Sequence, residues 1–263
     1  MAMNTDLPDL TEELRDGILW VTFNRPEARN ALTFAMYERL ARICATMPTD
    51  GSVRAMVTSG AGGRAYAAGT DMTQFRAFET AEDALAYERR IDAVLDAIER
   101  CPVPTIAAIH GACTGGGASI AAACDLRIAS AQLKYGFPIA RTLGNCLAAA
   151  NLARLSELIG AGRVREMIFT ARLIEADEAL SCGLVSEILP DEAALMARAA
   201  ELAALVGGMA PLTLRATKEA LRRNRAAAKV DDDDLITLCY MSEDFRIGME
   251  AFLGKTKPEW TGR

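Results

Sequence analysis

The sequence of 263 residues lacks several features that mark particular classes of protein. It has one histidine, His110, and no Cys-x-x-Cys pair, so it gives little support for a zinc site. It has no long basic run and a formal net charge of −6, which argues against binding nucleic acid, because neutralising phosphates needs clustered lysine and arginine. No apolar run reaches the length of a membrane span. We therefore expect a small-molecule partner, no nucleic acid and no membrane.

The chain also lacks the patterns of secretion and of familiar hydrolases. Residues 1–9 contain Asp6 and Asp9 and no basic stretch followed by an apolar one, so we expect no secretory signal. The seven cysteines are odd in number and scattered among mostly apolar neighbours, which predicts reduced, packed thiols and a cytoplasmic protein. No Gly-x-Ser-x-Gly elbow occurs, and we expect His110 to be a hydrogen-bonded residue at the end of a strand rather than a base.

The order of apolar segments predicts how the core is built, and a hydrophobic content of 51% is enough for a large one. Short runs rich in β-branched and aromatic residues alternate with stretches of helical spacing, which favours an α/β fold with largely parallel sheets. The expected strands cover residues 17–23, 53–58, 105–109, 125–129 and 183–189. The expected helices cover residues 32–47, 81–100, 147–159 and 175–180, with a short one ending at Cys124. From Asp191 onward the pattern is helical, and the composition changes near Gly207.

Two glycine-bearing loops carry the most specific pattern in the chain. The first reads Arg64-Ala-Tyr-Ala-Ala-Gly-Thr-Asp-Met72, and the second reads His110-Gly-Ala-Cys-Thr-Gly-Gly-Gly-Ala-Ser119. Together they resemble the signature of the crotonase (enoyl-CoA hydratase/isomerase) superfamily, which pairs an A-G-x-D loop with a G-G-G loop. The resemblance covers nearly the whole chain, from Asn24-Arg25-Pro26 to the ending Pro258-Glu-Trp-Thr-Gly-Arg263.

This resemblance implies an α/β fold in which a crotonase-like spiral of ββα units fills residues 1–206 and a helical C-terminal oligomerisation region fills residues 207–263. It implies an enzyme, a lyase or an isomerase, that acts on an acyl-CoA thioester. Coenzyme A is then part of the substrate, and we expect no separate cofactor and no metal. Members of the family commonly form trimers and pairs of trimers, so the resemblance also implies a homotrimer or a hexamer.

Glycine-bearing loops suit this chemistry because two converging backbone N–H groups stabilise an enolate or a tetrahedral oxyanion only where nothing bulky blocks them. By resemblance, the amides of Thr70 and Gly116 form this oxyanion hole. Gly116 also opens a helix, whose dipole favours negative charge at that end. The alternative is that residues 115–117 only allow a helix to pack tightly on a strand.

The resemblance also assigns residues to coenzyme A. It places Ala68, Asp71 and Met72 along the adenine and the pantetheine, and basic residues can meet the phosphates. The full set of predicted substrate-binding residues is Arg25, Ala28, Ala68, Asp71, Met72 and Lys255, with Arg29 as a further basic candidate. For each basic residue taken alone, a solvated place on the surface is at least as good an explanation.

The chain departs from hydratases of this family where they hold water between two glutamates. The corresponding positions hold Ser119, after the glycine run, and Ile139, after Tyr135-Gly-Phe-Pro138. Each lost carboxylate removes a general acid or base that contributes about 10²–10⁴-fold, which argues against ordinary hydration. We name Ser119 as a third catalytic residue, since its hydroxyl can donate a hydrogen bond. Glu79 or Glu88 is another source of a carboxylate, although solvated helix charges are the stronger expectation.

Three further residues, Arg141, Asn145 and Cys146, are candidates for the pocket. Each has a plainer alternative: Arg141 solvated, Asn145 capping the following helix, and Cys146 packed within it. Three functions remain open. The first is a hydratase or isomerase whose acid/base group has moved. The second is a malonyl-type acyl-CoA decarboxylase, in which loss of carbon dioxide forms the enolate without a carboxylate base. The third is a non-catalytic CoA-binding homologue that serves as an assembly partner.

Overall fold

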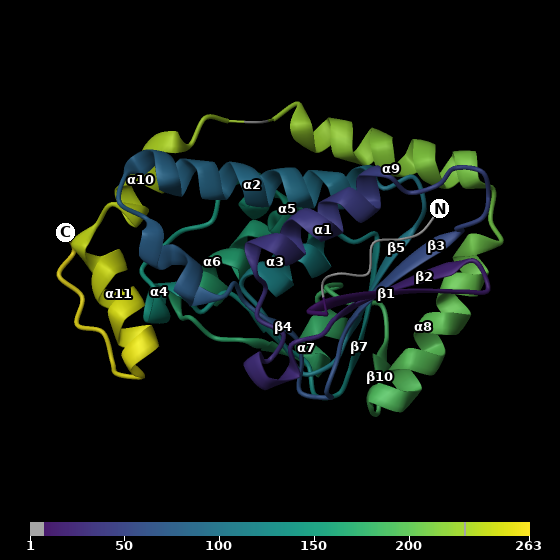
Figure 1. Cartoon of the computed structure of the whole chain (residues 1–263), viewed down its shortest axis with the longest axis horizontal. Coiled ribbons are helices and arrows are strands. Elements are labelled where there is room, and N and C mark those ends of the chain that lie inside the picture. The colour runs from purple at the N-terminus through teal and green to yellow at the C-terminus, as the bar shows by residue number, and fades with distance from the viewer. Residues whose placement is uncertain (1–7, 229) are drawn as a thin grey trace.

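The computed structural model describes residues 8–228 and 230–263. The prediction that residues 1–9 hold no secretory signal therefore falls mostly outside the described residues. The larger sheet has six strands in the order β1-β2-β3-β5-β7-β10 (Figure 1). Its strands are β1 Leu10–Arg15, β2 Ile18–Phe23, β3 Ala55–Gly60, β5 Thr105–Ile109, β7 Leu126–Ser130 and β10 Ile188–Leu189. β1 pairs antiparallel with β2, and every later pair in this sheet is parallel.

A smaller sheet has four strands in the order β4-β6-β8-β9. Its strands are β4 Ala65–Ala68, β6 Ala112–Thr114, β8 Lys134–Gly136 and β9 Ile174–Glu175. β4, β6 and β8 are parallel, and β9 runs antiparallel to β8. Because β4, β6 and β8 are parallel, the loops that follow them leave the sheet at the same edge.

The helices cover both faces of this framework. They are α1 Phe34–Ala45, α2 Ala81–Arg100, α3 Gly116–Ala123, α4 Ile139–Thr142, α5 Ala149–Ile159, α6 Ala161–Phe169, α7 Ala176–Ser181, α8 Glu192–Gly207, α9 Pro211–Ala226, α10 Asp233–Tyr240 and α11 Glu243–Gly254. Two short 3₁₀ turns, η1 Pro26–Ala28 and η2 Met72–Ala77, flank the first glycine loop. Thr33 is the N-cap of α1, and its side-chain oxygen accepts a hydrogen bond from the Met36 amide.

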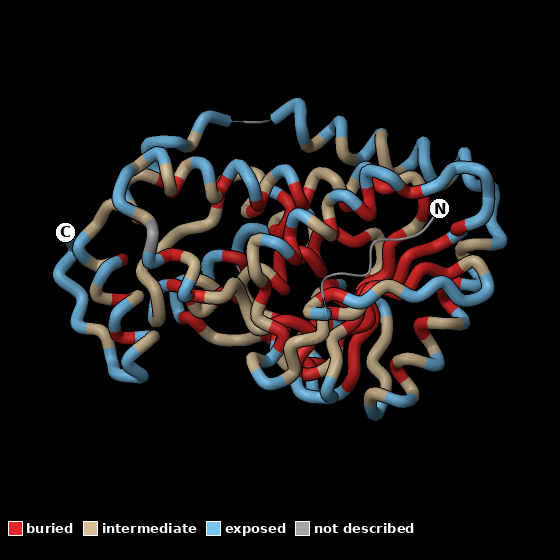
Figure 2. Tube along the Cα trace, in the orientation of Figure 1, coloured by how far each residue is buried: buried red, intermediate tan, exposed pale blue. Residues whose placement is uncertain are grey.

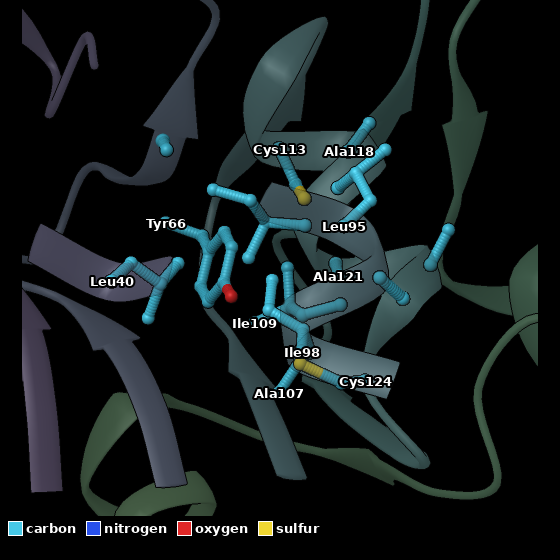
Figure 3. Packing of buried hydrophobic residues seen from close by; sticks show 14 of the residues in the cluster. Leu40, Tyr66, Leu95, Ile98, Ala107, Ile109, Cys113, Ala118, Ala121 and Cys124 are labelled. Atoms are coloured by element: carbon cyan, nitrogen blue, oxygen red, sulfur yellow. The ribbon is translucent and has the colours of Figure 1, made fainter. Parts of the chain in front are cut away.

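The larger sheet is buried on both faces, which explains why its central strands read as nearly continuous apolar runs. One face carries Trp20 and Val57 and packs against Leu195 and Ala199 of α8. The other face packs against α1, α2 and α3, and it includes Phe23. Figure 2 shows the buried centre of the molecule, and Figure 3 shows this second cluster from close by. The main core therefore lies between the larger sheet and helices α1, α2 and α3.

Most elements predicted from the sequence are confirmed, and those that were missed are mostly short. The helix predicted over residues 81–100 and the strand predicted over residues 105–109 are α2 and β5. The pattern missed β1, α6 and the short elements β4, β6, β8, β9 and α4. Two to four residues cannot establish the period of a strand or a helix. The strand predicted over residues 183–189 is wrong for most of its length, since α7 ends in a turn at Gly183 (φ 77°) and only Ile188–Leu189 is a strand.

The chain changes direction after α8, at the change of composition near Gly207. α8 packs on the larger sheet, whereas α9 runs back along α2 (Figure 1), and Lys218 Nζ of α9 lies 2.5 Å from Asp125 Oδ2. Within the described ranges no single helix is long and apolar enough to cross a membrane, and α8 and α9 pass that test only as a pair bent by 101°. The division into residues 1–206 and 207–263 stays a prediction.

Candidate active site

The two glycine loops lie side by side because they follow neighbouring parallel strands. Ala68, at the end of β4, is paired with Thr114, at the end of β6. Each strand continues into a glycine with left-handed backbone, Gly69 at φ 91° and Gly115 at φ 52°. A Cβ atom on Gly115 would lie 3.3 Å from the Cα atom of Gly69. Neighbouring strands lie about 5 Å apart, so the residues that follow these glycines are also close together.

The backbone amides of Thr70 and Gly116 come next along the two loops, and neither donates a hydrogen bond to a described residue. Gly116 opens α3, and the first amides of a helix have no partner within the helix. Thr70 is fixed by a bridge to Leu32, which donates to Gly69 O and accepts from the Asp71 amide. Thr70 and Gly116 line one cavity of about 130 Å³. The predicted pair of amides therefore belongs to the wall of a single space.

Each glycine of the run after β6 is required for a different reason. Gly115 has positive φ, which side chains rarely allow. A Cβ atom on Gly116 would lie 1.8 Å from Tyr37 Oη, and one on Gly117 would lie 2.3 Å from Ala67 O. Tight packing of a helix on a strand, the alternative explanation for the run, applies to Gly117. It does not apply to Gly116, whose missing side chain makes room for a tyrosine hydroxyl.

Tyr37 and Tyr87 hold the first glycine loop through their hydroxyl groups. Tyr37 Oη lies 2.9 Å from Thr70 Oγ1, which lies 3.1 Å from Tyr87 Oη. Burial raises the pKa of both phenols, so they are neutral at physiological pH. Since Tyr37 Oη also lies against Gly116, one buried hydroxyl positions both residues whose amides are predicted to form the oxyanion hole.

The two positions where glutamates are missing also line the cavity. Ser119 and Ile139 are both buried in its wall. Ser119 Oγ donates to Gly115 O at 3.3 Å and accepts from Asn151 Nδ2 at 2.8 Å. Its hydroxyl proton is therefore engaged within the protein, and the catalytic role of Ser119 stays a prediction. The side-chain oxygens of Asn145 and Asn151 are buried without a donor among the described residues, so the wall contains two further acceptors.

Glu88 of α2 supplies the one carboxylate among the described residues that line this cavity. Its side chain is buried, and Tyr240 Oη donates to Glu88 Oε1 at 2.6 Å. Asn145 Nδ2 in turn donates to Tyr240 Oη at 3.1 Å. Burial raises the pKa of Glu88 from 4.5 to about 7. The expectation of a solvated charge is therefore wrong for Glu88. It is confirmed for Glu79, which is exposed just before α2.

The predicted substrate-binding residues divide into two groups. Ala68 and Met72 line the cavity, and the others do not. Arg25 and Asp71 bind each other, with Nη2 and Oδ2 3.0 Å apart, so this pair holds the glycine loop in place. Ala28 is half-buried in η1, and Lys255 is exposed after α11.

Of the three candidates after Pro138, two line the cavity and one does not. Asn145 and Cys146 line it, whereas Arg141 is exposed, in agreement with its solvated alternative. The cap of α5 is Ala148, which makes no side-chain bond, so the alternative of Asn145 as a cap is wrong. Cys146 also lies before α5, outside the helix in which its alternative placed it.

Sequence reasoning missed Tyr37, Tyr87, Asn151 and Tyr240 and set Glu88 aside. A signal for Glu88 existed in the spacing of α2, where the buried positions are residues 84, 88, 91, 94, 95 and 98. A glutamate inside such an apolar stripe is unusual, because burying a lone charge is costly. Tyr240 had no comparable signal, since it lies far along the chain and meets Glu88 only through the packing of α10 on α2.

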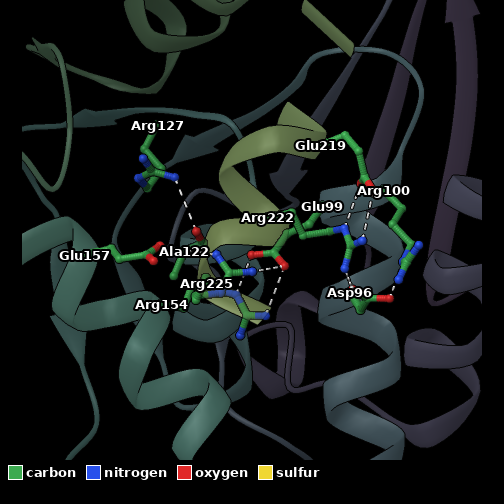
Figure 4. A network of polar contacts seen from close by, with 10 residues as sticks. All are labelled: Asp96, Glu99, Arg100, Ala122, Arg127, Arg154, Glu157, Glu219, Arg222 and Arg225. Carbon is green, nitrogen blue, oxygen red and sulfur yellow. Dashed lines mark hydrogen bonds and ion pairs between the residues drawn. The ribbon is translucent and has the colours of Figure 1, made fainter. Parts of the chain in front are cut away.

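A larger hollow, of about 430 Å³, lies beneath α9, and none of its lining residues belongs to the glycine loops. Its polar wall is a network of ion pairs (Figure 4). Arg154 Nε and Nη2 donate to the Glu99 carboxylate at 2.7 and 3.2 Å, and Arg225 binds the same carboxylate. Arg225 Nη1 also lies 3.3 Å from Glu157 Oε2. Because these charges bind one another, the network joins helices.

Comparisons with known proteins agree on one family. A model of the enoyl-CoA hydratase/isomerase family matches residues 13–263. The short-chain-enoyl-CoA hydratase of Clostridium acetobutylicum is 33% identical over 259 residues, which cover 97% of this chain and 98% of that protein. The enoyl-CoA isomerase/hydratase fer4 of Mycosarcoma maydis is 33% identical over 268 residues, 97% of this chain and 96% of that protein. A crystal structure of an enoyl-CoA hydratase/carnithine racemase from Magnetospirillum magneticum is 32% identical with a TM-score of 0.78, covering 100% of this chain and 97% of that one.

Proposed function

This chain belongs to the enoyl-CoA hydratase/isomerase family, and we propose that it binds an acyl-CoA thioester with the carbonyl oxygen between the amides of Thr70 and Gly116. It is an enzyme of the hydratase and isomerase class with a crotonase-like α/β fold. One observation carries the assignment of the site: two backbone amides without partners among the described residues belong to adjacent loops and to the wall of one cavity.

The arrangement favours an oxygen that gains negative charge. Removing a proton next to a thioester carbonyl places charge on that oxygen, and two prepositioned N–H donors stabilise it without reorganising. The N-terminus of α3 adds a favourable dipole at Gly116. The surrounding wall is largely apolar, which strengthens these interactions because the local dielectric is low.

The rest of the substrate is assigned by position. Ala68 and Met72 border the cavity and can contact the pantetheine arm, while Arg25 and Asp71 keep the loop in its conformation. The exposed Lys255 remains the cation proposed to meet a phosphate of coenzyme A. No cofactor apart from the substrate's own coenzyme A is proposed.

We also propose that the protein is cytoplasmic and that it assembles as a homotrimer or a hexamer. Exposed apolar side chains on the C-terminal helices support a contact with further copies of the chain, because burying such side chains is favourable. These residues are Leu212 and Leu221 of α9, Leu235 and Leu238 of α10, and Phe252 of α11.

A panel of thioesters tests the function. Purified protein is incubated with 2-enoyl-, 3-enoyl-, 3-hydroxyacyl- and methylmalonyl-type CoA esters, and the products are followed by mass spectrometry and proton NMR. We expect a shift of a double bond or the addition of water. Release of carbon dioxide from the malonyl-type ester alone would replace this proposal with a decarboxylase. Tight binding without any product would leave the non-catalytic homologue.

A further inference from the structure

Glu88 differs from the other acidic side chains of the described residues because it lines the cavity that Thr70 and Gly116 also line. It is 9% exposed, and Tyr240 Oη of α10 donates to it at 2.6 Å. Tyr87, its neighbour in α2, binds Thr70, so the same helix contributes to the loop and to the carboxylate. Ser119 and Ile139, at the positions of the usual glutamates, offer no carboxylate. Among the described residues, Glu88 is therefore the carboxylate that a substrate in this cavity can reach.

The groups around Glu88 keep it able to exchange a proton. The pKa of Glu88 is raised to about 7, mainly by burial and also by the charges of Asp92 and Asp232. The Tyr240 hydroxyl and the Ala148 amide donate to it and act in the opposite direction. No lysine or arginine among the described residues lines the cavity. The neutral titratable groups in its field are Tyr37, Tyr87, Tyr240 and Cys146, the last of which is hydrogen-bonded to Cys239.

We infer that Glu88 is the acid/base of this site and that the site isomerises 3-enoyl-CoA thioesters to 2-enoyl-CoA thioesters, with Tyr240 as a positioning residue. This inference rests on the proposed function. Isomerisation returns the proton that it removes, so one carboxylate can serve both halves of the reaction. Hydration instead activates a water at one carbon and protonates another, for which related hydratases use two glutamates.

The reaction is balanced in protons and electrons with the substrate and Glu88 alone. The Glu88 carboxylate removes a proton from C2, the C2–H pair becomes a C1–C2 double bond, and the carbonyl pair moves to the thioester oxygen between the two amides. The carbonyl then re-forms, and the π electron pair of C1–C2 moves to C2–C3. The π electron pair of the former C3–C4 double bond takes the proton from Glu88, which forms a C–H bond at C4. Glu88 ends as a carboxylate.

The test follows conversion of trans-3-hexenoyl-CoA to trans-2-hexenoyl-CoA by proton NMR between pH 5 and pH 9. Four proteins are compared: the wild type, Glu88→Gln, Tyr240→Phe and the control Glu79→Gln. Gln keeps the acceptor for Tyr240 but cannot carry the proton, so we expect a loss of about 10²–10⁴-fold in kcat with little change in thioester affinity. Glu79 is exposed and lies just before α2, so we expect its variant to keep the wild-type rate.

Tyr240→Phe separates positioning from simple support of the fold. Removing this donor raises the pKa of Glu88, because the Tyr240 hydrogen bond lowers it. We therefore expect the pH–rate profile to move to higher pH as well as a lower rate. A variant that is only less well folded lowers the amount of active protein and leaves the profile in place. Circular dichroism checks that all four proteins are folded.

The possible failures are distinguishable. If the wild type binds the thioesters but converts none of them, the proposed function itself is wrong. If the wild type isomerises and Glu88→Gln keeps its rate and pH profile, the assignment of Glu88 is overturned and the proposed function stands. If Glu88 is required but the main product is a 3-hydroxyacyl thioester, the assigned reaction is overturned and the residue is retained.

Discussion

Helix α2 carries two largely buried carboxylates in contrasting surroundings. Glu99, near its C-terminal end, is bound by the guanidinium groups of Arg154 from α5 and Arg225 from α9. Glu88, nearer its start, is bound by the neutral hydroxyl of Tyr240 and lies in the wall of the cavity that contains the glycine loops. A carboxylate bound by two cations ties helices together. One that is buried among neutral donors is free to gain and lose a proton near neutral pH.

The contrast also explains why the larger hollow is not the proposed site. Its charged side chains bind one another, and Arg154 Nη1 is the one buried polar side-chain atom of its described lining that has no partner, so a ligand would have to break ion pairs to reach most of them. The smaller cavity offers two amides and two amide oxygens that have no partner among the described residues. Unsatisfied groups in the wall of a cavity are better evidence of a ligand than the size of the cavity.

The largest expected effect is on stability, from removing the ion pairs of Glu99 near the C-terminal end of α2. Glu99→Gln leaves Arg154 and Arg225 largely buried without their shared carboxylate, and removing one partner of such a pair costs about 3–5 kcal/mol. Urea denaturation measures the free energy of unfolding, and kcat per folded molecule stays at the wild-type value. The control Glu157→Gln removes a half-exposed partner of Arg225 and costs less than about 1 kcal/mol. Equal effects of the two variants would refute the contrast.

The next effect is at the glycine loops. Gly116→Ala places a Cβ atom against Tyr37 Oη and displaces the amide, so we expect kcat to fall by about 10²–10³-fold, as for loss of one oxyanion donor. Gly162→Ala in α6 is the matched control, because a Cβ atom there has open space around it. Steady-state rates with the substrate found active report the difference. A fully active Gly116→Ala enzyme contradicts the proposed role of this amide.

Glu88→Gln is expected to change how the free energy of unfolding depends on pH. The pKa of Glu88 is raised on folding, so the stability it contributes is complete below about pH 4.5 and is lost as the pH rises through about 7. The glutamine variant lacks this loss. Relative to the wild type, its free energy of unfolding therefore increases by about 2–3 kcal/mol between pH 5 and pH 8.5. Denaturation at the two pH values measures this, and a difference independent of pH would contradict the raised pKa.

The smallest effect concerns the hydroxyl that joins the two loops. Tyr37→Phe removes one hydrogen bond from Thr70, which keeps the bond to Tyr87, and we expect a cost of about 1 kcal/mol in unfolding free energy. In the Gly116→Ala background the same change is favourable, because it removes the atom that the new Cβ atom meets. A double-mutant cycle of stability and kcat detects this reversal, and strict additivity would show that Tyr37 does not limit residue 116.

How much was predictable depends on the range of the interactions. The sequence predicted most of the strand and helix order. It also indicated both loops, because Gly69 and Gly115 have positive φ, which is a local backbone demand. The contact that requires Gly116, with Tyr37 of α1, is long-range and was not predicted. The surroundings of Glu88 were not predictable in the same way. Its position in the apolar stripe of α2 indicated burial, but its partner Tyr240 comes from a helix whose packing no local pattern specifies.

Deuterium uptake at the α-carbon of an acyl-CoA thioester tests the central claim most directly, because it reports formation of the enolate whatever the net reaction. Butyryl-CoA is incubated with each enzyme in D₂O and followed by proton NMR. We predict exchange with the wild type and with Gly162→Ala, and exchange slower by about 10²–10³-fold with Gly116→Ala. Exchange by a folded Gly116→Ala enzyme at the wild-type rate would contradict stabilisation of the enolate by the amide of residue 116.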